Sequence, residues 1–94
     1  MNIYELTVVL QGGVTPAKKK SVSEKIEKLV KDGKGKVAKI DEWGKIDLAY
    51  KIKKEPAGFF IHYNLEAEGS VAKSIKDKLR LDNDILRYLI VKKD

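Results

Sequence analysis

The chain has few side chains that could carry out chemistry, and their spacing does not form a catalytic or metal-binding motif. His62 is the single histidine and cysteine is absent, so a metal ion would need carboxylate ligands. The acidic groups Asp41-Glu42 and Asp82/Asp84 lack the ligand spacing of known metal sites. No nucleophile lies beside a plausible base in any motif. We therefore expect no catalytic residue, no metal and no cofactor, and we interpret His62 as a sheet-surface or interface residue.

Gly12-Gly13 follows the first apolar segment, at the position that a phosphate-binding loop often takes. The spacings G-x-G-x-x-G and G-x-x-x-x-G-K-[ST] are both absent, and a plain connection to a helix accounts for the two glycines. An acylphosphatase would have the order of elements derived below, but it would also need an arginine in this loop. Residues 11–15 contain none, so the sequence argues against that catalytic function.

Charge is the strongest compositional signal. The 94 residues form one expected domain, 1–94, with a formal net charge of +6 and 36% charged residues. Such an excess attracts polyanions, which favours a nucleic-acid partner over a lysine-rich surface kept for solubility. No segment approaches the ~18 apolar residues of a membrane span, and no signal peptide is visible. The absence of cysteine fits a reducing cytosol.

The first third of the chain predicts a strand and a helix. Residues 1–10 alternate so that one face of the strand is fully apolar. Thr15-Pro16 opens the helix, because threonine caps free N–H groups and proline suits the first helical position. Gly33 is a natural helix end. The apolar strand face is Tyr4, Leu6, Val8 and Leu10; the apolar helix stripe is Val22, Ile26, Leu29 and Val30; the opposite helix face, interpreted as solvated, holds Lys18, Lys19, Lys20, Lys25, Lys28 and Lys31.

A long hairpin is predicted from Trp43 to Tyr63. Residues 46–52 alternate as a half-buried strand does, and residues 59–65 are rich in aromatic and β-branched side chains. Residues 53–58, with Pro56 and Gly58, predict the turn. We expect this hairpin at the centre of the sheet, because it holds most of the aromatic residues. A preceding strand over 36–42 should contain a bulge near Val37 and Ile40, and residues 41–45 should interrupt it before the hairpin begins.

The remaining sequence predicts a helix from Gly69-Ser70, a turn at 82–84 and a last strand over 85–93. The near-continuous apolar run of that strand favours an inner position in the sheet. The order is then βαββαβ. This order predicts an α+β, ferredoxin-like fold, with a four-stranded antiparallel sheet and two helices on one face. The other face stays open, and on a basic protein it is a natural docking surface.

An RNA-recognition motif has the same order and stacks bases on sheet aromatics. Its third-strand signature is partly matched by residues 58–63. However, Ala57 stands in place of the lysine or arginine, and the small residue after the first aromatic is missing. The sequence therefore gives this family little support.

A second resemblance covers the whole chain. It is carried by Tyr4-Glu5, by Trp43-Gly44 followed by Leu48-Ala49-Tyr50-Lys51-Ile52, by Gly58-Phe59-Phe60, and by Asn83-Asp84-Ile85-Leu86-Arg87-Tyr88. With these residues the chain resembles the bacterial small-subunit ribosomal protein six family. Asn2 stands where that family often has arginine, and the acidic tail of some members is absent.

The resemblance implies a non-enzymatic protein of the cytoplasmic ribosome. It would bind the central domain of small-subunit rRNA together with small-subunit ribosomal protein eighteen and support platform assembly and translation, with no membrane and no small-molecule substrate. The expected rRNA-binding residues are Asn2, Tyr4, Lys51, Lys53, Lys54, Arg87 and Lys92, at mixed or polar strand positions that should lie near one another. The expected partner-protein residues are Trp43, Phe60 and His62; core packing is the alternative for Trp43 and Phe60, and it is slightly favoured for Phe60 only. The alternative from another class is a ferredoxin-like regulatory module that binds a small ligand.

Overall fold

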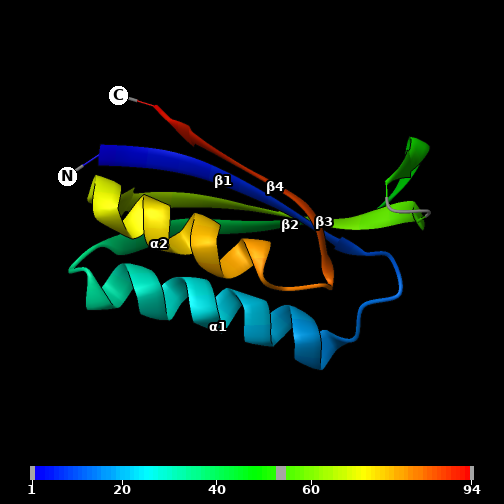
Figure 1. Cartoon of the computed structure of the whole chain (residues 1–94), viewed down its shortest axis with the longest axis horizontal. Coiled ribbons are helices and arrows are strands. Elements are labelled where there is room, and N and C mark those ends of the chain that lie inside the picture. The colour runs from blue at the N-terminus through cyan, green and yellow to red at the C-terminus, as the bar shows by residue number, and fades with distance from the viewer. Residues whose placement is uncertain (1, 53–54, 94) are drawn as a thin grey trace.

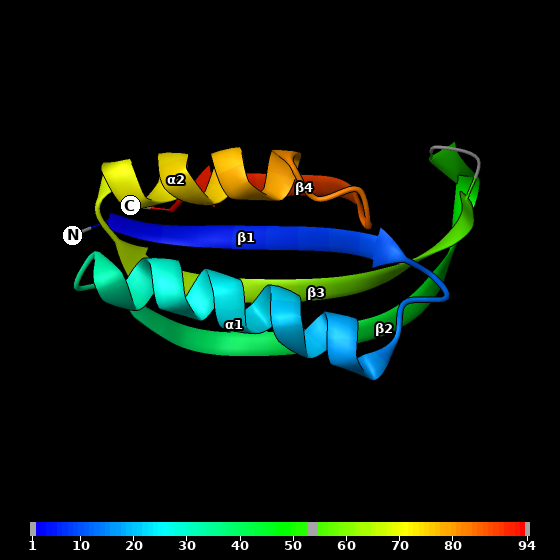
Figure 2. The same cartoon turned by 60° about the horizontal axis from the view of Figure 1, so that its bottom comes forward.

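The structure is a computed structural model that describes residues 2–52 and 55–93; side chains are described for residues 2–48 and 56–93. The elements follow in the order β1 (Asn2–Gln11), α1 (Pro16–Asp32), β2 (Lys36–Ile52), β3 (Glu55–Ala67), α2 (Gly69–Arg80) and β4 (Ile85–Lys92). The strands form an antiparallel sheet in the order β2-β3-β1-β4. Both helices cover one face of it (Figures 1 and 2). The predicted ferredoxin-like fold is confirmed.

The predicted strand and helix near the N-terminus form for the expected reasons. The even-numbered side chains of β1 from Tyr4 to Leu10 are buried against the helices. At the start of α1, the Thr15 hydroxyl accepts a hydrogen bond of 3.2 Å from the Lys18 N–H, and Pro16 occupies the first turn. At its end, the Gly33 N–H donates to the Leu29 carbonyl. The apolar stripe of α1 thereby faces the sheet.

One apolar core lies between the sheet and the two helices. Tyr63 is its largest fully buried side chain, and its hydroxyl lies 2.9 Å from the Ser23 hydroxyl on α1. Burial raises the pKa of Tyr63, although the hydrogen bond to Ser23 opposes the shift. The other fully buried large side chains are Leu6, Leu10, Ile26, Ile61, Leu65, Ile75, Val8, Val22 and Val30. This layer fixes the helices on one face and leaves the other sheet face uncovered.

Two expectations about strand position are wrong. The last strand, β4, is an edge strand that pairs only with β1. Of the predicted hairpin, β3 is central but β2 forms the opposite edge. The reason is topological: each helical crossover places its second strand across a neighbouring strand, so that β1 and β3 become the inner pair. An apolar run therefore did not identify an inner strand.

The β2–β3 hairpin also departs from the predicted boundaries. The expected interruption at 41–45 is wrong, because β2 continues through it with a register shift between Glu42 and Gly44. The bulge expected near Val37 is confirmed by a shift between Val37 and Lys39. The turn predicted over 53–58 is too long, since β3 begins at Glu55 and pairs with Ile52. Residues 53–54 lie outside the described residues.

Candidate functional site

The open sheet face carries an aromatic cluster, defined here as Trp43, Phe60 and His62. The Trp43 ring lies nearly parallel to His62, with ring centres 5.2 Å apart and planes 8° apart. It also stacks on Phe60 at 6.3 Å and 17°. The His62 Nδ1 atom lies 3.0 Å from the Thr7 hydroxyl on β1, which fixes the imidazole plane. The structure thus brings together the three residues that the sequence predicted for a partner protein.

The bulge in β2 explains why Trp43 reaches this face. Glu42 opposes Ile61 and Gly44 opposes Phe60, so Trp43 is the additional residue between the two register pairs. Gly44 has a φ of 87°, in the left-handed region that favours glycine. The indole consequently lies flat over Phe60 and His62 while 51% of the residue remains exposed. Such a large exposed apolar ring is typical of an interface anchor.

A second apolar area, missed by the sequence analysis, lies across the same face. Leu89 opposes Thr7 and Val91 opposes Glu5, so both share the face on which Ile3 and Thr7 lie. We call Ile3, Leu89 and Val91 the apolar strip. All three are exposed, and Leu89 has 61% of its surface in solvent. The signal was present in β4, where these side chains alternate with better buried ones, but it was obscured by assuming an inner strand.

Part of the predicted RNA-binding set gathers near the chain ends. The Asn2 side-chain amide donates to the Tyr4 hydroxyl at 3.4 Å, and Tyr4 opposes Lys92 on β4. Tyr4 is buried in the core, Asn2 is partly buried and Lys92 is exposed. Arg87 is exposed farther along β4, opposite Val9. Asn2, Tyr4 and Lys92 therefore form one region near the chain ends, whereas Arg87 lies apart from it on the open sheet face, beside the strand pair of Val9 and Phe60.

The rest of that set belongs to the hairpin. Lys53 and Lys54 lie outside the described residues. The Lys51 backbone is in β2, and its side chain is also outside the described part. The chain termini and the β2–β3 hairpin end lie at opposite ends of the sheet (Figure 2). Of the four candidates whose side chains the structure describes, Asn2, Tyr4 and Lys92 lie together and Arg87 lies apart from them, so these four do not form one site.

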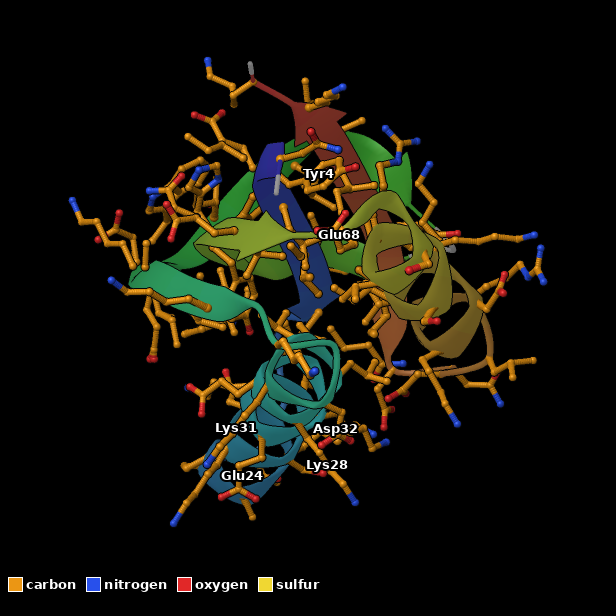
Figure 3. The ribbon with its side chains drawn as sticks, turned by 90° about the vertical axis from the view of Figure 1, so that its left-hand side faces the viewer. Tyr4, Glu24, Lys28, Lys31, Asp32 and Glu68 are labelled. Atoms are coloured by element: carbon orange, nitrogen blue, oxygen red, sulfur yellow. The ribbon has the colours of Figure 1, made fainter. Side chains whose placement is uncertain are left out.

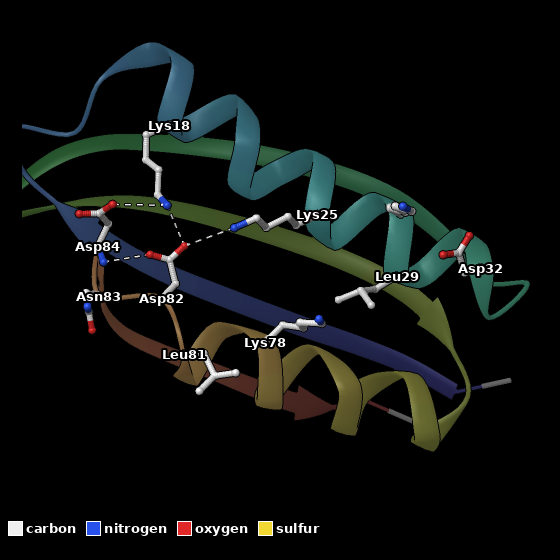
Figure 4. A pocket seen from close by; sticks show the side chains of 10 residues that line it. Lys18, Lys25, Leu29, Asp32, Lys78, Leu81, Asp82, Asn83 and Asp84 are labelled. Atoms are coloured by element: carbon white, nitrogen blue, oxygen red, sulfur yellow. Dashed lines mark hydrogen bonds and ion pairs between the residues drawn. The ribbon is translucent and has the colours of Figure 1, made fainter.

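A charged clip on the helix side was not predicted. The Lys18 ammonium donates to Asp82 at 2.9 Å and lies 3.3 Å from Asp84, while Lys25 lies 3.8 Å from Asp82 (Figure 4). The hydrogen bond to Asp82 raises the pKa of Lys18. Burial alone would raise the pKa of Asp82, but the hydrogen bonds from Lys18 and the Asp84 backbone lower it overall. The clip joins α1 to the turn before β4, across 64 residues of sequence.

Within residues 2–52 and 55–93, no three histidine, cysteine, aspartate or glutamate side chains gather as a metal site would require. In the same ranges, neither helix has the length and the apolar character that crossing a membrane requires. The structure shows instead three kinds of surface: a partly aromatic sheet face, a polar edge and a charged helix side.

Comparison with known proteins identifies the family of this chain. The model for the family described as Ribosomal protein S6 matches residues 3–92. Small ribosomal subunit protein bS6 of Pelagibacter ubique is 34% identical over 92 residues, covering 98% of this chain and 76% of that protein. The bS6 protein of Streptomyces coelicolor is also 34% identical over 92 residues, with 98% and 96% covered.

Solved structures show the same fold. The crystal structure of 30S ribosomal protein S6 from Thermotoga maritima superposes with a TM-score of 0.89 at 22% identity, covering 98% of this chain and 87% of that one. The C-terminal domain of the MgtC protein from Mycobacterium tuberculosis gives 0.66 at 10% identity, with 99% and 88% covered, a likeness of fold alone. Because the family model spans nearly the whole chain and bS6 relatives exceed 30% identity along it, the chain belongs to the ribosomal protein S6 family of the small subunit.

Proposed function

We propose that the chain is a structural, non-catalytic constituent of the small subunit of the cytoplasmic ribosome. In this role it binds the central domain of small-subunit rRNA together with small-subunit ribosomal protein eighteen, and it supports platform assembly and translation. The observation that carries the proposal is the family match over residues 3–92. The fold agrees with it, because the sheet face opposite the helices is open and carries anchors suited to a partner.

The protein partner is assigned to the open sheet face. The aromatic cluster offers a stacked, half-exposed Trp43, and the apolar strip adds aliphatic surface on β1 and β4. Exposed apolar area of this kind gains free energy when a partner removes it from water. Lys39 and Asp41, beside the cluster, already form a 3.6 Å ion pair, so the surroundings of the cluster hold compensated charges. Such a face suits a protein better than a phosphate backbone.

The rRNA is assigned to the two ends of the sheet and to Arg87, which borders the open face opposite Val9. Arg87 and Lys92 are exposed on β4 and can neutralise phosphates, and the Asn2 amide can donate to a phosphate or a ribose. Tyr4 can contribute only through its hydroxyl at the edge of the core. Lys51, Lys53 and Lys54 would add cationic contacts from the hairpin. These contacts position the RNA through its shape and backbone and do not read its sequence.

Sedimentation of a tagged chain expressed in a bacterial host tests the role. We expect it to migrate with the small subunit in a sucrose gradient and to stay there in moderate salt. The tag is placed at either end in turn, to control for its interference. Migration as free protein with both tags would refute the ribosomal role and favour the small-ligand regulatory module. A Lys51/Lys53/Lys54→Ala triple variant that kept full rRNA affinity and salt dependence would refute the hairpin assignment alone.

A further inference from the structure

The excess positive charge of the chain lies entirely in its two helices. α1 and α2 together contain ten lysines and arginines against four carboxylates. The rest of the chain contains ten of each, so the whole net charge of +6 belongs to the helices. Because the sheet carries no net charge, the electrostatic attraction for a polyanion is directed to the side opposite the open sheet face.

A groove between the helices contains four of these lysines together with the carboxylates of Asp32, Asp82 and Asp84. It has a volume of about 700 Å³ and is lined from α1 by Lys18, Lys25 and Lys28 and from α2 by Lys78. The turn with Asp82 forms one end, where the charged clip lies, and Asp32 lies toward the other (Figure 4). Leu29 and Leu81 add apolar surface to the lining of the groove. In the view along the helix, Lys28 projects outward from α1 (Figure 3).

The lysines of the groove differ in how far they are already compensated. Lys18 and Lys25 are within ion-pair distance of Asp82. Lys28 and Lys78, by contrast, have no ion-pair partner among the residues that the structure describes. Both side chains are exposed. Unpaired ammonium groups on opposite banks of one groove can each take a phosphate oxygen without breaking an existing ion pair. The clip meanwhile joins α1 to the turn between α2 and β4.

We propose that this groove is a second RNA contact, which takes the phosphate backbone of an rRNA segment between Lys28 and Lys78. The proposal rests on the proposed ribosomal function, and it adds a contact on the face opposite the protein-docking sheet. The protein would then lie between its protein partner on one side and RNA on the other. RNA is the favoured occupant because phosphates occur along it at regular intervals and match several separate ammonium groups.

Two variants of equal charge test the groove. Lys28→Gln/Lys78→Gln removes the unpaired lysines of the groove, and Lys73→Gln/Lys76→Gln removes two exposed lysines of α2 outside it. Each is assayed with transcribed central-domain rRNA and purified protein eighteen over a range of salt concentrations. We expect the groove variant alone to lower the slope of log affinity against log salt by about 1.4 to 1.8, as the loss of two phosphate contacts requires.

The outcomes are distinct. If both variants had the same salt slope as the unaltered chain, the groove contact would be refuted and the ribosomal role would stand. If both variants lowered the slope equally, the lysines would act only through the overall positive charge of the helices, and the groove contact would again be refuted. If the unaltered chain with its partner bound no rRNA, both proposals would fail.

A measurement that needs no variant is lysine acetylation of the assembled subunit. Lys28 and Lys78 should be protected relative to the free chain, and full reactivity in the particle would refute the contact.

Discussion

The open sheet face and the helix side of this small protein differ in the kind of surface that they offer. The sheet face holds the aromatic cluster and the apolar strip, on a sheet without net charge. The helices contain the positive excess, and the groove between them contains Lys28 and Lys78, which have no ion-pair partner within residues 2–52 and 55–93. Burial of apolar area acts at short range and needs a fitting surface, whereas charge acts over about 10 Å in salt solution. The two faces are thus suited to a protein and to a nucleic acid, respectively.

The largest expected effect compares two leucines on opposite faces of neighbouring strands. Leu6 on β1 is fully buried against the helices, and Leu89 on β4 is exposed on the open face. We expect Leu6→Ala to lower the free energy of unfolding by about 2 to 5 kcal/mol, because it leaves a cavity in the core. Leu89→Ala should change it by no more than about 0.5 kcal/mol. Urea unfolding measures both, and a similar loss at the two sites would contradict the division into a core face and a docking face.

The next effect concerns the aromatic cluster. We expect Trp43→Ala to weaken binding of purified protein eighteen by about 2 kcal/mol, roughly thirty-fold, because the partner loses its central aromatic anchor. Leu81→Ala provides the matched control, since Leu81 is also highly exposed but lies on the helix side. Titration calorimetry compares the two. Unchanged affinity for Trp43→Ala, or an equal loss for Leu81→Ala, would refute docking at the cluster.

The charged clip should make part of the stability depend on pH. The folded pKa of Asp82 is below the ordinary value of 3.8, so its contribution is present above that value and is lost as pH falls through the folded pKa. We expect Asp82→Asn to cost about 1 kcal/mol at pH 7 and progressively less in acid. Chemical unfolding of both chains at pH 7 and below pH 4 measures the difference. A cost that stayed constant with pH would show that the ion pairs contribute nothing.

The smallest effect tests the bulge that presents Trp43. Gly44 has a positive φ, whereas Gly13 does not, and an added Cβ would meet no atom within 4 Å at either position. Gly44→Ala should therefore cost about 1 kcal/mol from backbone conformation alone. Gly13→Ala should be neutral or slightly stabilising. Thermal unfolding distinguishes them, and equal midpoints would mean that the bulge conformation is not strained by a side chain.

Local patterns predicted much of this molecule. The alternation of β1 and the stripe of α1 identified the buried faces, since periods of two and 3.6 follow directly from strand and helix geometry. Thr15 and Gly33 marked the helix ends for equally local reasons. The candidates Trp43, Phe60 and His62 lie in contact, because Phe60 and His62 alternate along β3 and Trp43 lies on the strand paired with it; their role toward a partner protein stays a prediction.

Other features depended on contacts between distant segments. The apolar run of β4 fits an inner strand or an edge strand beside an open face equally well, and only the crossovers decided for the edge. Likewise, the bulge at Gly44 appeared in the sequence as an interruption, because a glycine beside polar residues also occurs in loops. The separation of Arg87 from Asn2, Tyr4 and Lys92 followed from the strand register, which places Arg87 opposite Val9 and Lys92 opposite Tyr4.

The sequence by itself determined the periodicity of the elements, their order and the net charge of +6, since each of these is a property of neighbours along the chain or a sum over it. The tertiary structure decided where those properties lie in space. It placed β1 and β3 inside, laid Trp43 flat on its two ring neighbours, and joined Lys18 to Asp82 across the helix layer. The physical reason is that pairing of strands and packing of helices couple residues far apart in the chain, and this coupling is absent from any local pattern.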